Sequence, residues 1–315
     1  MKSLFRKWLI GEDAISVISK ITTPDDLQQK VWLRLGNKIL DVSKTHSFLC
    51  IEPIIFGVWI EKDAIQMQTP ETTKYQLYVG NSVDAEKNSM NNPEARLSLE
   101  LFDYIEDSGG TFLLLRLKKN NIYHLNFLKR NFIYFWYYKR NGFTYSRFKS
   151  FVAAYSYPRR IRIVSFRQDQ YFNIFPMDLL SDLSPYKRFA FGLQNTNTTL
   201  PKIIETGKLV VSEVSHSHKE IIYQLGKHHS SSPPALDALP FDVISSKQFG
   251  FYIPVWAESY KEIKILKTIN MGSHMLLWGE LVGEEQITEP SDHLFLVHYL
   301  HYLHQKTKGV KYTLV

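Results

Sequence analysis

Hydrophobic and polar residues follow short runs along most of the chain, and this pattern is typical of β-strands. Strands are expected at 31–35, 48–51, 54–60, 75–79, 111–117, 161–166, 171–175, 188–194, 208–214, 251–257 and 274–281. Turn residues such as Gly36-Asn37 and Gly80-Asn81 separate several of these runs. The chain is therefore predicted to be mainly β.

Helices are expected at a few places between the strands. Residues 1–30 are predicted to be an amphipathic helix with its connection, and residues 292–306 a terminal helix. A helix at 197–206 has Pro201 in its first turn and Gly207 at its end, and a shorter one at 219–225 is closed by Gly226. Strands with two short helices in the second half favour a small Greek-key barrel over a doubly wound sheet.

The stretch 161–180, IRIVSFRQDQYFNIFPMDLL, is the most informative part of the second half. Pro176 lacks a backbone donor, so the strand that contains it must end or lie at an edge there. Backbone groups beside Asn173, Phe175 and Met177 would then be free. Such groups could bind the edge of a flat heteroaromatic ring.

These residues also resemble a known family. The run Asn173-Ile174-Phe175-Pro176-Met177-Asp178 is similar to the flavin-contacting strand of the flavin reductase-like family, the FMN-binding split barrels. Residues 195–212 (NTNTTLPKIIETGKLVVS) resemble the family's helix and following strand, and 256–280, ending NMGSHMLLWGE, resemble its late barrel strands. The resemblance implies a Greek-key split β-barrel of the FMN-binding type at 155–315. A β-rich N-terminal domain of unknown role would precede it at 1–154.

The resemblance also implies where a cofactor binds. A helix N-terminus presents unpaired amides, and the hydroxyls of Thr198 and Thr199 beside Asn197 add donors for a phosphate. The alternative is that these residues only cap the helix. Gln194 and Asn195, just before them, could contact the ribityl chain or the phosphate.

Two further segments are candidates for contact with the flavin. His228-His229-Ser230 resembles the loop with which relatives cover the flavin, although a solvent-exposed turn is the alternative. His274 stands where relatives carry a polar group at the start of a late strand, although a lone histidine is more often structural.

The family's activity supplies a functional hypothesis. In an active relative, NADH or NADPH reduces FMN, and the flavin then reduces an acceptor, so the expected protein is a flavoprotein oxidoreductase without a catalytic acid or base. The family forms homodimers with flavin near the interface, which implies a homodimer here. The alternative is a non-catalytic flavin-binding electron carrier or interaction module.

Composition and charge narrow the other possibilities. The net charge of +7 suits an anionic partner, and residues 123–160 combine aromatic with basic side chains, as single-strand nucleic-acid surfaces do. No RNA-binding signature accompanies that stretch, so packing between domains is the favoured interpretation and no nucleic acid is expected. The chain lacks both the dinucleotide and the P-loop fingerprint, and no nucleophile motif of a hydrolase occurs.

Metal binding and membrane insertion are not predicted. His298, His301 and His304 recur every three residues, but spacing implies no carboxylate or cysteine partner for a metal. The single cysteine, Cys50, fits a reducing cytoplasm, which is the expected location. No apolar stretch reaches the ~20 residues that a membrane-spanning helix needs.

Overall fold

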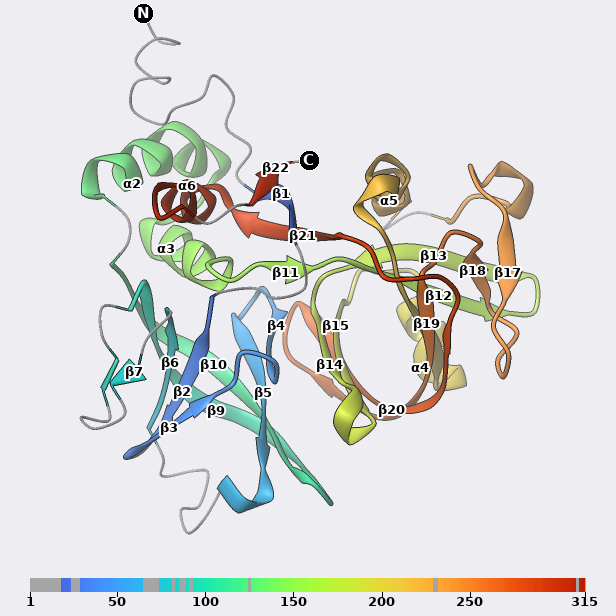
Figure 1. Ribbon diagram of the computed structural model, residues 1–315, viewed down its shortest axis with the longest axis horizontal. Coiled ribbons are helices and arrows are strands. Elements are labelled where there is room, and N and C mark those ends of the chain that lie inside the picture. The colour runs from blue at the N-terminus through green and yellow to red at the C-terminus, as the bar shows by residue number, and fades with distance from the viewer. Residues whose placement is uncertain are drawn as a thin grey trace, which may run out of the picture.

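Two curled antiparallel sheets lie side by side in the computed structural model (Figure 1). The structure describes residues 18–23, 29–64, 74–80, 83–84, 89–90, 93–123, 126–228, 232–309 and 312–314. The predicted fold class, mainly β with a split barrel, is confirmed. No helix within the described residues is long and apolar enough to cross a membrane.

The first barrel is a seven-stranded sheet with the order β3-β2-β6-β9-β10-β5-β4. Its strands are β2 (Val31–Leu35), β3 (Lys38–Asp41), β4 (His46–Cys50), β5 (Ile55–Glu61), β6 (Tyr75–Val79), β9 (Ala95–Asp107) and β10 (Gly110–Ile122). Short elements η1 (Lys62–Ala64), β7 (Val83–Asp84) and β8 (Ser89–Met90) lie in its connections.

The second barrel is also seven-stranded, with the order β13-β12-β16-β19-β20-β15-β14. Its strands are β12 (Arg162–Gln168), β13 (Tyr171–Met177), β14 (Leu180–Leu183), β15 (Arg188–Gln194), β16 (Lys208–Glu213), β19 (Ser259–Asn270) and β20 (His274–Gln286). β13 is an edge strand that runs through Pro176, as a strand without one of its backbone donors can.

The two barrels have the same topology. Replacing β2, β3, β4, β5, β6, β9 and β10 by β12, β13, β14, β15, β16, β19 and β20 converts the first strand order into the second. The long hairpins β9–β10 and β19–β20 each contain two register shifts. In both hairpins one extra residue lies on the strand before the turn and the other on the strand after it, with three residue pairs between the two shifts. The β2–β3 and β12–β13 turns also both use a positive φ, at Gly36 (59°) and Asp169 (54°). The chain thus contains one barrel topology twice.

The barrels share a hydrophobic core where they meet. Trp59 and Trp278, one from each barrel, stack with ring centroids 6.1 Å apart, and Phe112 lies 4.9 Å from Trp278. At the edge of this core, Arg188 of the second barrel forms an ion pair with Asp107 of the first, with 2.5 Å between Nε and Oδ2. The two barrels therefore form a single packed unit.

A third sheet and a helical layer join the ends of the barrels. The sheet has the order β11-β21-β1-β22, formed by Arg159–Arg160, His293–His298, Ile18–Thr23 and Thr313–Leu314. The helical layer lies over one end of the first barrel (Figure 1) and consists of α2 (Phe127–Ile133), the π-helical turn η3 (Tyr134–Tyr138), η4 (Lys139–Asn141), α3 (Tyr145–Ala154) and α6 (Tyr299–Thr307). Phe148 and Val152 of α3 are buried in the first core.

The remaining elements cover the second barrel. They are η5 (Ser184–Tyr186), α4 (Leu200–Thr206), η6 (His216–His218), α5 (Lys219–Leu225), η7 (Gly226–His228), η8 (Leu236–Ala238), β17 (Val243–Ser245) and β18 (Tyr252–Pro254). α4 begins later than predicted, with Thr199 as its N-cap, and Gly207 ends it in the left-handed conformation at φ 65°.

Three sequence predictions are wrong. Residues 293–298 form a strand, because all six pair with β1, and this pairing overrides the helical pattern of the sequence. Of the strand expected at 251–257 only β18 is present, and it pairs with β17 outside the barrel. The barrel strand begins at Ser259. Ile18–Thr23 is a strand where a helix was expected, and residues 1–17 lie outside the described part.

Candidate functional site

Three buried polar residues from two segments of the second barrel, β13 and the loop before α4, lie close together. Asn173 on β13 donates a hydrogen bond from Nδ2 to the Thr199 hydroxyl at 2.7 Å, and the Tyr171 hydroxyl lies 2.9 Å from the same oxygen. The Thr199 amide in turn donates to Asn197 Oδ1 at 2.8 Å. Asn197 is 2% exposed, and its Nδ2 has no hydrogen-bond partner within the described residues. A buried donor of this kind is suited to an acceptor on a ligand.

The same loop is tied to the start of β20. Gln194, the last residue of β15, pairs with His274, the first of β20. Asn195 donates one hydrogen bond from its backbone N–H to the Ser273 carbonyl oxygen at 3.0 Å. Its side-chain Nδ2 donates another to the Gly272 carbonyl oxygen at 2.6 Å. The His274 side chain is buried, and its Nδ1 lies 2.8 Å from the Ser273 hydroxyl. Residues 171–173, 194–199 and 272–274 are therefore brought together around one loop.

The other residues of the predicted flavin strand point in different directions. Phe175 and Met177 lie in the core of the second barrel, whereas Ile174 packs in the cluster beneath α5. Asp178 follows the far end of β13 and forms an ion pair with Arg159, with 2.8 Å between Oδ2 and Nη2. Asp178 is therefore separated from Asn173 by roughly 16 Å of strand.

The predicted covering loop is only partly described. His229 and Ser230 lie outside the described residues, as does the side chain of His228. The turn before them starts beside the edge strand, since a Cβ at Gly226 would lie 3.3 Å from Pro176 Cγ. A contact between this loop and flavin stays a prediction.

The first barrel differs from the second at the equivalent positions. The third residue of β13 is Asn173, whereas the third residue of β3 is Leu40. β20 begins with His274, whereas β10 begins with Gly110. At these two described positions the polar residue occurs in the second barrel and not in the first.

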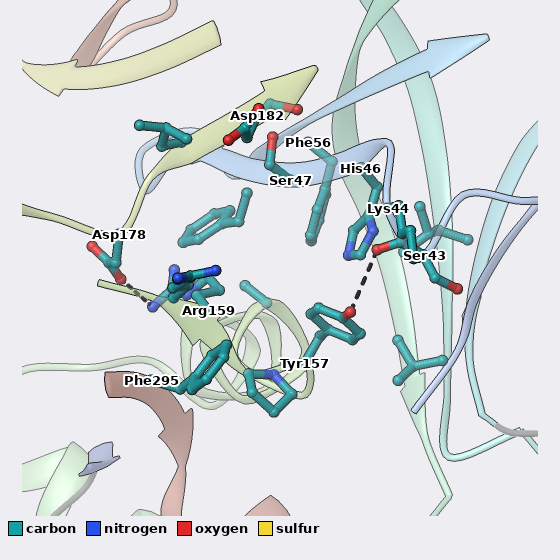
Figure 2. A pocket seen from close by; sticks show the side chains of 18 of the residues that line it. Ser43, Lys44, His46, Ser47, Phe56, Tyr157, Arg159, Asp178, Asp182 and Phe295 are labelled. Atoms are coloured by element: carbon teal, nitrogen blue, oxygen red, sulfur yellow. Dashed lines mark hydrogen bonds and ion pairs between the residues drawn. The ribbon is translucent and has the colours of Figure 1, made fainter. Parts of the chain in front are cut away.

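A cavity of about 380 Å³ lies between the two barrels (Figure 2). Most of its lining comes from the segments 43–48 of the first barrel, 178–182 at the corresponding place in the second, and 157–162 between them. One or two residues each of β5, β6, β9, α3 and β21 complete it. Of the predicted cofactor residues only Asp178 lines it. Sequence reasoning did not find this cavity, although the basic run Arg159-Arg160 was a visible signal.

Charged groups pack closely beside the cavity. Glu213 lies 2.9 Å from Arg160 Nε and 2.5 Å from Arg162 Nε. Burial disfavours the charged form of Glu213, but Arg162 and Arg160 outweigh that effect and hold the pKa of its carboxyl below the ordinary value. Asp182 is held ionised in the same way, because Arg162 and Lys261 outweigh its burial and lower its pKa. These carboxylates and their partners are charged at neutral pH.

His46, on the cavity wall, is neutral at pH 7. Burial lowers its pKa to about 4, and its Nδ1 lies 2.8 Å from the Val42 carbonyl oxygen, which can accept the ring proton. The unfolded chain takes up this proton near pH 6.5, whereas the folded chain does so only near pH 4. His46 therefore costs stability as the pH falls through this window, at up to about 1.4 kcal/mol per pH unit.

We expect the His46→Gln variant to lack this acid-dependent loss. Urea unfolding at pH 7, 5.5 and 4 measures the free energy of unfolding of both proteins. The wild type should lose stability relative to the variant between pH 6.5 and 4. Parallel pH profiles would show that His46 does not titrate as its burial implies.

The terminal histidines have structural partners. His298 Nε2 lies 2.8 Å from the Tyr138 hydroxyl, and His301 Nε2 lies 2.9 Å from Gln29 Oε1. His304 Nε2 lies 3.6 Å from a carboxylate oxygen of Glu94. Among the described residues no group of three or more His, Cys, Asp or Glu is placed to hold a metal ion.

The basic aromatic stretch forms the helical layer. Its inner residues join the first core, while Phe127 and Phe135 are 65% and 56% exposed. Lys139 Nζ lies 5.1 Å from the ring centroid of Phe135, so cations and aromatic rings share this outer face. The expected absence of nucleic-acid binding stays a prediction.

Comparison with known proteins returned solved structures only. No protein-family profile and no curated protein sequence matches the chain. An FMN-binding protein from Thermus thermophilus is 20% identical, with a TM-score of 0.39, over 44% of this chain and 81% of that protein. An NADH:FAD oxidoreductase of Streptomyces globisporus is 14% identical (TM-score 0.42; 49% and 89% covered). The flavin reductase component of a bacterial two-component tryptophan halogenase is 15% identical (TM-score 0.39; 46% and 89% covered).

Proposed function

We propose that the second barrel binds FMN and that the protein is an oxidoreductase that takes electrons from NADH or NADPH. The observation that carries this proposal is the convergence of 171–173, 194–199 and 272–274 on the loop before α4. These are parts of the segments that resemble flavin reductase-like proteins in sequence. Their convergence is what a single binding site requires.

The residues at this loop fit the phosphate end of FMN. Asn197 Nδ2 is a buried donor without a hydrogen-bond partner among the described residues, and the side chain of Thr198 beside it is exposed. Lys202 on α4 adds positive charge, with its Nζ 4.8 Å from the ring centroid of Tyr171. The ammonium group of Lys202 and the neutral donors of Asn197 and Thr198 together suit a phosphate dianion.

FMN would supply the redox chemistry, and the chain would bind and orient it. Asn197, Thr198 and Lys202 would hold the phosphate. Asn173 would fix the loop through its bond to Thr199. No residue of the chain is assigned as a catalytic acid or base.

The proposal predicts that FMN binds more tightly than FAD. There is one compact phosphate site, and the chain lacks a dinucleotide fingerprint. Titration of both flavins against intrinsic fluorescence tests this, and equal or tighter FAD binding would contradict it. Steady-state oxidation of NADH and NADPH by the FMN-loaded protein then separates an oxidoreductase from a non-catalytic flavin carrier.

We also propose that the two barrels of one chain take the place of the two subunits of a homodimer. The barrels share topology and a hydrophobic core, but among the described residues the first has Leu40 and Gly110 where the second has Asn173 and His274. The expected result is a monomer that binds one FMN per chain. Light scattering after size-exclusion chromatography, with FMN titration of the same sample, measures both quantities. A dimer would instead favour the family's homodimeric arrangement, and two flavins per chain would contradict the single site.

A further inference from the structure

The cavity between the barrels has an anchor for a negatively charged group. Arg159 is 7% exposed, and Figure 2 shows its guanidinium among the side chains around the cavity. Its Nη2 pairs with Asp178, and its guanidinium carbon lies 3.5 Å from the ring centroid of Tyr155. These contacts hold the side chain in one place.

Arg159 nevertheless has unused donors. Within the described residues its Nε and Nη1 have no hydrogen-bond partner. Buried N–H groups without an acceptor are costly, and a guanidinium cannot remove the cost by losing its proton. Arg160 and Arg162 differ from Arg159, because both are paired with Glu213.

A second unused donor comes from the first barrel. Ser47 on β4 is 9% exposed, and its hydroxyl also has no hydrogen-bond partner in the described part of the chain. Ser47 and Arg159 both line the cavity. An acceptor with two oxygens could therefore be bound from both sides.

Apolar side chains form one part of the wall, beside polar and charged residues that include Lys44, Arg160 and Arg162. The apolar part consists of Phe48, Phe56, Leu77, Val79, Leu97 and Phe295 and can hold a compact apolar body. Asp178 and Asp182 also line the cavity, and they would repel a phosphate dianion more strongly than a single carboxylate. The volume of about 380 Å³ is within the range of small-molecule sites.

We propose that this cavity is a binding site for a small monocarboxylate with a compact apolar body, its carboxylate bound by Arg159 and Ser47. The proposal is independent of flavin binding, because it uses none of the residues around the loop before α4. It assigns a role to the contact between the barrels. Arg159 lies on β11 of the third sheet and Ser47 on β4 of the first barrel, so the first barrel alone does not supply both donors.

Calorimetric titration of the full chain without added flavin tests the proposal. The probes are benzoate, phenylacetate and hexanoate, each beside its neutral amide. Since charge-assisted bonds are about twice as strong as neutral ones, at least one carboxylate should bind about tenfold or more tightly than its amide. Arg159→Gln should weaken that carboxylate by about tenfold or more.

Arg167→Gln is the matched control. Arg167 lies on β12 with its guanidinium carbon 4.2 Å from the ring centroid of Tyr252, so it is also stacked on a tyrosine, but it does not line the cavity. This variant should bind the carboxylate as the wild type does. Ser47→Ala is a smaller change and should weaken binding of the carboxylate several-fold. This variant still tests the proposal if Arg159→Gln fails to fold.

Three results would overturn the proposal. They are the absence of binding by every carboxylate at millimolar concentration, equal binding of acids and amides, and unchanged binding in Ser47→Ala. Full competition between FMN and the bound carboxylate would overturn the assignment of a separate site. The FMN titration itself is read independently, so failure of either proposal leaves the other measurable.

Discussion

The Gly192→Ala variant is expected to lose about 3 kcal/mol of unfolding free energy, the upper part of the usual range for an overpacked core. Gly192 lies on β15 where the second barrel touches β4 of the first. A Cβ there would lie 1.8 Å from the carbonyl oxygen of Leu49 and 2.7 Å from its carbonyl carbon. Both are backbone atoms, so no side-chain rotation can relieve the contact, and the barrels would have to separate.

Gly109→Ala provides the control for this change. It lies in the β9–β10 turn, and a Cβ there would meet its nearest neighbour, Trp59 Cζ2, at an ordinary 3.5 Å. Urea unfolding should place this control near the wild type and Gly192→Ala well below it. Similar stability of the two variants would mean that β15 and β4 are not close enough for a Cβ at position 192 to collide with the Leu49 backbone.

Thr198→Val is expected to weaken FMN binding, whereas Thr199→Val is expected to lower the stability of the fold. Thr198 is exposed beside the proposed phosphate site, and a hydrogen bond to a charged group is worth about 1.5–3 kcal/mol, so its loss should weaken FMN binding roughly 10- to 100-fold. Thr199 is fully buried and accepts the bond from Asn173. Its replacement leaves the buried amide unpaired, which should cost about 1–3 kcal/mol of stability.

Two measurements separate these roles. The melting temperature of the flavin-free protein should fall in Thr199→Val and stay unchanged in Thr198→Val. The FMN dissociation constant should rise in Thr198→Val. Intact FMN affinity in Thr198→Val would remove this residue from the proposed site.

The sequence predicts individual strands well where turn residues mark an end of the apolar run. Residues 75–79 and 188–194 form β6 and β15 with the predicted bounds. It fails for residues 293–298, because this strand passes directly into α6 at Tyr299 with no turn residue between them. The edge position of the strand through Pro176 follows from one missing donor, and the structure confirms it.

The duplication and the cavity could not be predicted in the same way. The repeat spans a whole barrel, and what the two copies share is strand order, bulge positions and turn geometry, not side chains. The cavity combines residues as distant as Ser47 and Phe295, which only the contact between barrels brings together. The sequence did point to the segments around Asn173 and Thr199, through Pro176, the expected helix start and the resemblance to flavin reductase-like proteins.

When two barrels are joined in one chain, the sequence of each can change independently of the other. In a symmetric dimer every substitution occurs at both equivalent positions, so a bulky residue cannot be added on one side and removed on the other. Here Trp59 and Gly192 occupy corresponding positions, each the third residue from the end of a seven-residue strand in its own barrel. The large ring fills the shared core while the glycine admits the neighbouring backbone. Natural selection can refine such an asymmetric fit only when the two halves mutate separately.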